Sequence, residues 1–184
     1  MRIFLIAALF FTAAGCREVS FPVPQQRSMP EFRLRQILEI RPESDGFAAT
    51  AQNSSIIGGV LPVAPGLDWS WTTAHPAFRF KLDQPSGWDL DIKLTTADVV
   101  FDKIGPQQLT VLVNGTKTGS ATLDQCRTWL LRFPVAPALL PDPAETRVTL
   151  AIAPCLPQPE GPPLCILLHN VGFTRPLTAQ DPGR

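Results

Sequence analysis

Two tryptophans, Trp69 and Trp71, are the residues whose type and spacing best suit ligand recognition. Residues two positions apart in a strand point to the same side, so we expect the two rings to share one face. An aromatic ring packs well against the apolar face of a sugar, while polar groups around it bind the hydroxyls. The preceding stretch LPVAPGLD places the pair near a sheet edge. They are predicted as possible ligand-binding residues, although an aromatic lid over the core is the more common use of such a pair.

Carboxylates suggest a second chemistry. Asp89 and Asp91 lie on one face of the alternating segment WDLDIKL, and two neighbouring carboxylates can hydrolyse a glycosidic bond. Alternating charge on a solvent-facing strand is the commoner explanation, and Lys93 continues the same stripe. Asp98 and Asp102 follow, and carboxylates at a sandwich edge can instead hold Ca²⁺. We favour the solvated strand, and we expect no catalytic residue, no metal and no cofactor.

The histidines and glycines add no catalytic motif. His75 and His169 lack a serine nucleophile elbow and the partners of a triad. The segment IIGGV lacks the lysine and the following helix of a phosphate-binding loop. The sequence therefore predicts a protein that is not an enzyme.

The cysteines suggest an oxidising compartment. Cys155 and Cys165 bracket the Pro-rich segment LPQPEGPPL, and a disulfide between them is the pairing that we favour. A bridge from Cys126 to either of them is the alternative. If Cys126 is free, packing is its expected role, although the adjacent Arg127 would lower the pKa of its thiol. The spacing does not fit a zinc site.

The chain begins MRIFLIAALFFTAAGC. One arginine, an apolar run and small residues before Cys16 have the layout of a secretory signal peptide, and the run is shorter than the roughly 20 residues that span a bilayer. The ending AAGC resembles the lipobox of bacterial lipoproteins, with Ala13 where that family more often has leucine. The resemblance implies that residues 1–15 are removed and that Cys16 is lipidated. Ordinary cleavage, leaving a free thiol, is the alternative.

A lipid on Cys16 would anchor the protein to a membrane of the bacterial cell envelope. Arg17 stands where many inner-membrane lipoproteins have aspartate. This difference favours the outer membrane, facing the periplasm, if the cell is Gram-negative. Residues 16–30 contain three prolines and are predicted to form a tether.

Charge and proline content limit the classes of partner and of fold. Sixteen basic and sixteen acidic residues balance, so no net field favours nucleic acid as a partner. The chain has twenty prolines and no tyrosine, and Pro-rich turns between short apolar runs favour an all-β domain.

Period-two alternation of apolar and polar residues predicts the strands. Strands are expected at AFRFKL, WDLDIKL, LTVLV, TWLLRF, RVTLAIA and LCILLHNVGF. The segment EFRLRQILEIR fits a strand better than a helix. Trp88 and Trp129 lie at inward positions, which predicts a core role for both. Asn114-Gly115 predicts a hairpin, but its register is left open because Leu112 opposite Lys117 fits poorly. The pattern predicts one β-sandwich of about eight to ten antiparallel strands over residues 31–176, no convincing helix, and a disordered tail over 177–184.

From about residue 53 onward, the order of segments resembles jelly-roll modules of bacterial exported proteins, some of them appended to membrane glycosyltransferases. The segments that carry the resemblance are WSWTTAHPAFRFKL, GPQQLTVLVNG, CRTWLLRFPV and the closing VGF. Those modules are carbohydrate-binding-like and have no catalytic motif to transfer. The resemblance implies a jelly-roll-like β-sandwich and a binding role, with a carbohydrate of the envelope as partner. A structural or protein-interaction subunit of an envelope complex is the alternative.

Overall fold

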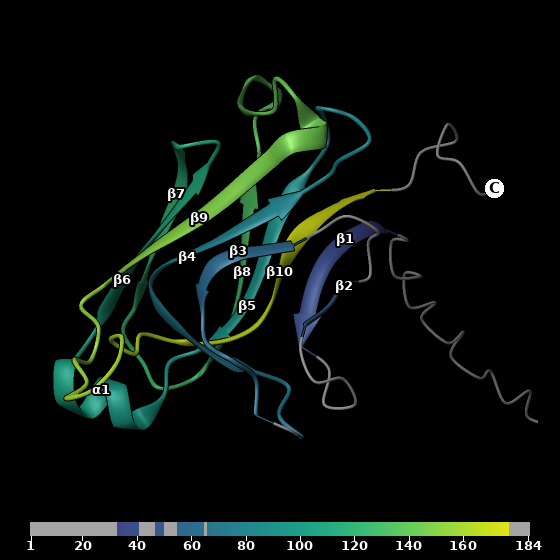
Figure 1. Cartoon of the computed structure of the whole chain (residues 1–184). Coiled ribbons are helices and arrows are strands. Elements are labelled where there is room, and N and C mark those ends of the chain that lie inside the picture. The colour runs from purple at the N-terminus through teal and green to yellow at the C-terminus, as the bar shows by residue number, and fades with distance from the viewer. Residues whose placement is uncertain (1–32, 41–46, 50–54, 65, 177–184) are drawn as a thin grey trace, which may run out of the picture. The chain divides into compact units, whose positions relative to one another are not determined.

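This computed structural model describes residues 33–40, 47–49, 55–64 and 66–176. They contain ten strands, one short α-helix and two 3₁₀ turns. Figure 1 shows their arrangement. The elements are β1 (Arg33–Ile40), β2 (Phe47–Ala49), β3 (Ser55–Val60), β4 (Ser70–Phe80), β5 (Asp89–Thr95), α1 (Asp98–Ile104), β6 (Gln107–Val113), β7 (Thr116–Leu123), β8 (Thr128–Pro134), β9 (Thr146–Ala153) and β10 (Leu167–Pro176), with 3₁₀ turns at Pro137–Leu139 and Pro143–Glu145.

The strands pair antiparallel in two sheets. Sheet A has the order β2–β1–β10–β5–β8, and sheet B has the order β3–β4–β9–β6–β7. Strand β4 takes part in both, because its first residues pair with β10 and its last residues pair with β9. Several neighbours are distant in sequence, as β10 between β1 and β5 illustrates (Figure 1). The predicted fold class, an all-β jelly-roll-like sandwich, is confirmed.

The core lies between the two sheets and follows the predicted alternation. The inward side chains of β4, β5 and β9 are all buried; they are Phe78, Phe80, Leu90, Ile92, Leu94, Val148, Leu150 and Ile152. Phe173 of β10 lies edge-to-face with Phe80 at 5.2 Å between ring centroids, which joins sheet A to sheet B.

Trp88 and Trp129 belong to this core, as predicted. Each ring buries its apolar body and still uses its single N–H donor. Trp88 Nε1 donates to the carbonyl of Gln84 at 2.9 Å, and Trp129 Nε1 donates to Thr96 Oγ1 at 3.0 Å. A buried indole without such a partner would lose the hydrogen bond that it makes to water in the unfolded chain.

The β6–β7 hairpin has a two-residue turn at Asn114 and Gly115, with φ of 49° and 81°. Both turn positions need positive φ, which explains the Asn-Gly pair. Leu112 does pair with Lys117, the register that the sequence made doubtful, and a bulge beyond it corrects the alternation by placing Val111 opposite Gly119. Val111 and Val113 are two residues apart on β6 and both reach the core.

The ambiguous segment at the start of the domain and one unpredicted helix complete the secondary structure. Residues 33–40 form a strand rather than a helix. Helix α1, in contrast, was not predicted, because its seven residues are too few to show a helical period; it buries Val100 and ends at Gly105, which has φ of 72°. No helix among the described residues has the length and apolarity to cross a membrane. The predicted signal peptide, the tether, Cys16 and the tail 177–184 lie outside the described residues.

Candidate ligand-binding site

A pocket of about 340 Å³ opens on the outer face of sheet A. Leu90, Ile92 and Leu94 of β5 point into the core, so Asp91 and Lys93 point outward by alternation. We call this pocket the outer groove. Strands β1, β5, β8 and β10 all contribute to its lining, which consists of Ile37, Asp91, Ile92, Lys93, Leu130, Leu131, Arg132, Asn170 and Thr174.

A glycine lies in register between two of the residues that line the outer groove. Gly172 of β10 is in register with Ile37 of β1 on one side and with Asp91 of β5 on the other. Residues directly opposite each other share a face, so a strand position that would normally carry an outward side chain is vacant here. Leu130 of β8, whose exposed fraction is 79 %, adds an apolar group at the far edge. The groove therefore has apolar side chains at its edges, and the strand position between Ile37 and Asp91 has no side chain.

Arg132 and Thr174 fix the carboxylate of Asp91. Arg132 Nε donates to Asp91 Oδ1 at 2.6 Å and its Nη2 donates to Oδ2 at 3.1 Å. Thr174 Oγ1 donates to the same Oδ2 at 2.8 Å. This two-point arginine–carboxylate geometry orients both groups and satisfies both carboxylate oxygens.

Lys93 and Asn170 have no such partners. They lie opposite each other on β5 and β10, and both are half-buried. Neither side chain has a hydrogen bond or an ion pair with the described part of the chain. Lys93 also pairs in register with Leu130 of β8. An ammonium and an amide thus face the outer groove with donors to offer a ligand.

Trp71 lies on the same face as the outer groove. Ser70 and Thr72 are buried, so Trp71 between them points outward. Trp71 pairs with Leu167, and Leu167 pairs with Thr95, which stands two residues from Lys93. One such step along a strand is about 7 Å. Strands β4 and β1 occupy the same edge of β10 one after the other, so the face runs from Trp71 into the groove.

Trp69 and Trp71 pack against each other, edge-to-face, with ring centroids 6.2 Å apart. Both are half-buried. Neither belongs to the core cluster or to the half-buried apolar residues that pack against it. The pair is therefore brought together as the spacing predicts, beside the core rather than over it.

His169 connects the tryptophan segment to sheet A. It is the extra residue of a β-bulge in β10, its Nε2 lies 2.9 Å from Thr95 Oγ1, and its Nδ1 lies 3.5 Å from Asp68 Oδ2. Asp68 directly precedes Trp69. Burial lowers the pKa of His169 below 6.5, the charge of Lys93 lowers it further, and Asp68 opposes both effects.

The predicted carboxylates are divided between two places. Asp89 and Asp91 share the outer face of β5, but Arg132 and Thr174 already occupy the oxygens of Asp91. Asp98 and Asp102 lie on α1. Within the described ranges, no three His, Cys, Asp or Glu side chains gather as metal ligands would.

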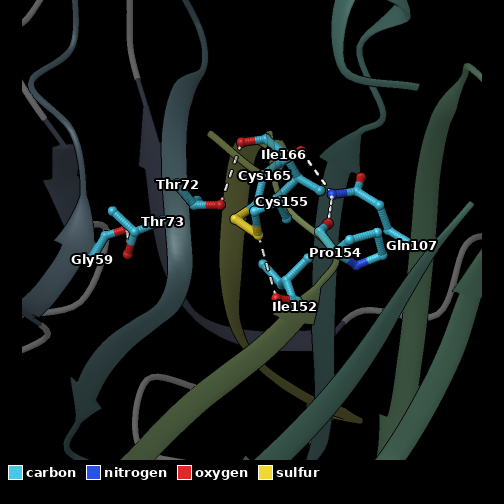
Figure 2. The surroundings of a disulfide bond; sticks show 9 residues. All are labelled: Gly59, Thr72, Thr73, Gln107, Ile152, Pro154, Cys155, Cys165 and Ile166. Carbon is cyan, nitrogen blue, oxygen red and sulfur yellow. Dashed lines mark hydrogen bonds between the residues drawn. A yellow bond between two sulfur atoms is a disulfide. The ribbon is translucent and has the colours of Figure 1, made fainter. Parts of the chain in front are cut away.

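Cys155 and Cys165 form a disulfide, which closes the Pro-rich loop between β9 and β10. Gln107 Nε2 donates to the carbonyls of Pro154 and Cys165 at 2.9 and 3.2 Å, so one side chain ties both ends of the loop to β6 (Figure 2). On the other side, the Cys165 N–H donates to the carbonyl of Thr72 at 3.0 Å. The disulfide loop is thereby tied to β6 and to β4.

Cys126 is a free, exposed thiol, so the expectation that it packs is wrong. The expectation that Arg127 lowers its pKa is wrong as well. Desolvation, a hydrogen bond to Asp98 and the charges of Asp98 and Asp102 raise the pKa of Cys126. The Arg127 guanidinium lies over the Trp129 ring instead, 3.9 Å from its centroid.

Comparison with known proteins does not identify a family for this chain. No protein-family model and no curated protein matches the chain. Among solved structures, the chain is similar to a carbohydrate-binding module, CBM36, in complex with calcium and xylotriose. The identity is 10 %, the TM-score is 0.33, and the match covers 78 % of this chain and 98 % of that one. A likeness of this size does not establish a shared ligand.

Proposed function

We propose that this protein is a non-catalytic binding module that holds a glycan of the bacterial cell envelope against the outer face of sheet A. The observation that carries the proposal is that Trp71, with Trp69 packed against it, lies on the same face of sheet A as the outer groove. Aromatic and aliphatic groups suit the apolar faces of sugar rings, and the polar side chains between them suit the hydroxyls.

The groove has the mixed lining that a sugar requires. Ile37 and Leu130 offer apolar contact, Lys93 and Asn170 offer donors, and the Asp91 carboxylate keeps lone pairs beyond those used by Arg132 and Thr174. Because the Asp91–Arg132 pair is fixed by two hydrogen bonds, the groove loses little side-chain entropy when a ligand binds.

A role purely in protein association is less well supported. The large apolar side chains that are most exposed in the described residues are Ile57, Val99 and Leu130. They lie on β3, α1 and β8 respectively. A protein-interaction surface more often gathers such residues in one contiguous patch.

The test is a titration of the full-length protein in detergent against a panel of envelope polysaccharides. Replacing Trp69 and Trp71 together by alanine is expected to weaken binding at least tenfold, or about 1.4 kcal/mol. The matched Trp71→Phe variant keeps a ring and is expected to retain most of the affinity. Binding of no polysaccharide, or unchanged affinity in the double alanine variant, would contradict the proposal.

The proposal includes export and a lipid anchor on Cys16, supported by the resemblance of AAGC to a lipobox. In a Gram-negative cell, the anchor is placed in the outer membrane, facing the periplasm. Mass spectrometry of the mature protein is expected to find an acylated N-terminal Cys16. A Cys16→Ala variant is expected to leave the membrane fraction, and an unmodified thiol at the mature N-terminus would remove this part of the proposal.

A further inference from the structure

Lys93 is a half-buried cation that forms no ion pair with the side chains that the structure describes. The carboxylate nearest to it along its own strand, Asp91, has both oxygens engaged by Arg132 and Thr174. On the tryptophan side, Asp68 faces His169 rather than Lys93. Leu130, its register partner on β8, carries no charge.

Among the side chains that the structure describes, the charged ones that line the outer groove are Asp91, Lys93 and Arg132; Glu39 of β1 also lies in register with Asn170. Asp91 and Arg132 form an ion pair at 2.6 Å, whereas Lys93 forms none with the side chains that the structure describes. Partial burial strengthens the interaction of such a charge with a ligand, because less water screens it.

We propose that the outer groove selects an acidic sugar and binds its carboxylate between Lys93 and Asn170. This inference rests on the proposed glycan-binding function and names the class of sugar. Lys93 supplies an ammonium and Asn170 supplies an amide N–H, from adjacent strands and on the same face. The ammonium of Lys93 carries the charge opposite to that of a uronate carboxylate.

The rest of the groove accommodates the sugar ring. Gly172 leaves the floor between Ile37 and Asp91 without a side chain. The exposed Leu130 stands beside Lys93 in register. A carboxylate held at Lys93 and Asn170 therefore leaves the apolar face of its ring within reach of an aliphatic side chain, and the next sugars can extend along the face toward Trp71.

The experiment compares charged polymers with their neutral counterparts. Alginate, polygalacturonate and hyaluronan are each titrated against the full-length protein in detergent, beside the polymer made from each by carboxyl reduction, and beside neutral polysaccharides. We expect at least one uronate polymer to bind tenfold or more tightly than its reduced form, and we expect this preference to fall as salt rises.

Three variants assign the preference to the groove. Lys93→Gln is expected to remove the preference, while Lys93→Arg retains it. Lys117→Gln, a matched change at an exposed lysine on β7 of sheet B, is expected to have no effect. Thermal unfolding of each variant shows whether the fold is intact.

The outcomes separate the two proposals. If neutral polysaccharides bind and no uronate is preferred, the inference is wrong and the glycan-binding function stands. A preference that survives Lys93→Gln in a folded variant also overturns the inference. If neither neutral nor acidic polymers bind, the proposed function fails, and the inference fails with it.

Discussion

Arg132 of β8 holds the Asp91 carboxylate of β5 through two hydrogen bonds, with Nε 2.6 Å from Oδ1 and Nη2 3.1 Å from Oδ2. The pair bridges two neighbouring strands on the outer face of sheet A. Its main consequence is electrostatic, because it cancels one positive and one negative charge beside Lys93. The Arg132 side chain is 53 % exposed, so we expect its ion pair to contribute less than about 1 kcal/mol to stability.

Replacing Arg132 and replacing Asp91 are expected to change the affinity for an acidic sugar in opposite directions. Arg132→Met leaves the Asp91 charge uncompensated next to Lys93, which should weaken binding of a uronate polymer. Asp91→Asn leaves an additional positive charge, which should strengthen it. The measurement is the affinity of both variants for the uronate polymer and for its carboxyl-reduced form. Changes of the same sign in the two variants would contradict the charge argument.

Loss of the disulfide is expected to lower stability without affecting the site. The bridge joins residues ten positions apart, and closing a loop of that size stabilises the fold by about 2–3 kcal/mol. We expect the free energy of unfolding of the Cys155→Ala/Cys165→Ala variant, measured by urea unfolding, to be lower by that amount. The wild-type protein should show the same loss in reductant.

Cys126→Ser is the matched control, because Cys126 is exposed and forms no disulfide. Its urea midpoint should be unchanged. An equal loss in this control, or no loss in the double variant, would show that the disulfide is not what stabilises the Pro-rich loop.

Stability should depend on pH through His169. Burial lowers the pKa of His169 below its ordinary value of 6.5, so between the two values the unfolded chain binds the proton and the folded chain does not. The free energy of unfolding therefore falls as the pH falls below 6.5 toward the lower pKa. We expect the His169→Gln variant to lack this part of the pH dependence, measured by urea unfolding at several pH values. Parallel pH curves for the two proteins would exclude this role for His169.

Gly59 and Gly58 offer adjacent positions with opposite expectations. Gly59 has φ of 76°, and a Cβ there would lie 2.6 Å from the Cα of Pro76 and 2.7 Å from the carbonyl oxygen of His75. Backbone atoms cannot move aside cheaply, so Gly59→Ala is expected to cost about 2 kcal/mol or more. A Cβ at Gly58 meets nothing within 4 Å, and Gly58→Ala should be close to neutral. Equal unfolding midpoints in the two variants would contradict this account of IIGGV.

Much of the fold follows from local patterns. Alternation predicts the strands because each sheet has one dry and one wet face, and Phe78, Leu90 and Val148 are buried as that rule requires. Asn114-Gly115 predicts its hairpin because few other pairs tolerate positive φ twice. The doubtful register of Leu112 shows the limit of the rule, since the bulge that resolves it carries no clear sequence signal.

The outer groove could not be predicted in the same way. Its residues come from four strands, and their proximity depends on a strand order that places the last strand, β10, between β1 and β5. Lys93 was visible only as part of a charged stripe, and Asn170 and Gly172 gave no signal until register placed them beside Lys93 and Asp91. Trp69 and Trp71 were accessible from spacing alone because they belong to one continuous stretch.

The most direct test of the central claim is a crystal structure of the protein with the oligosaccharide that binds it most tightly. The account predicts that the sugar lies over β10 and β5, in contact with Lys93 and Asn170, and that its chain runs toward Trp71. A sugar bound on the outer face of sheet B, or at the disulfide loop with the groove empty, would contradict it.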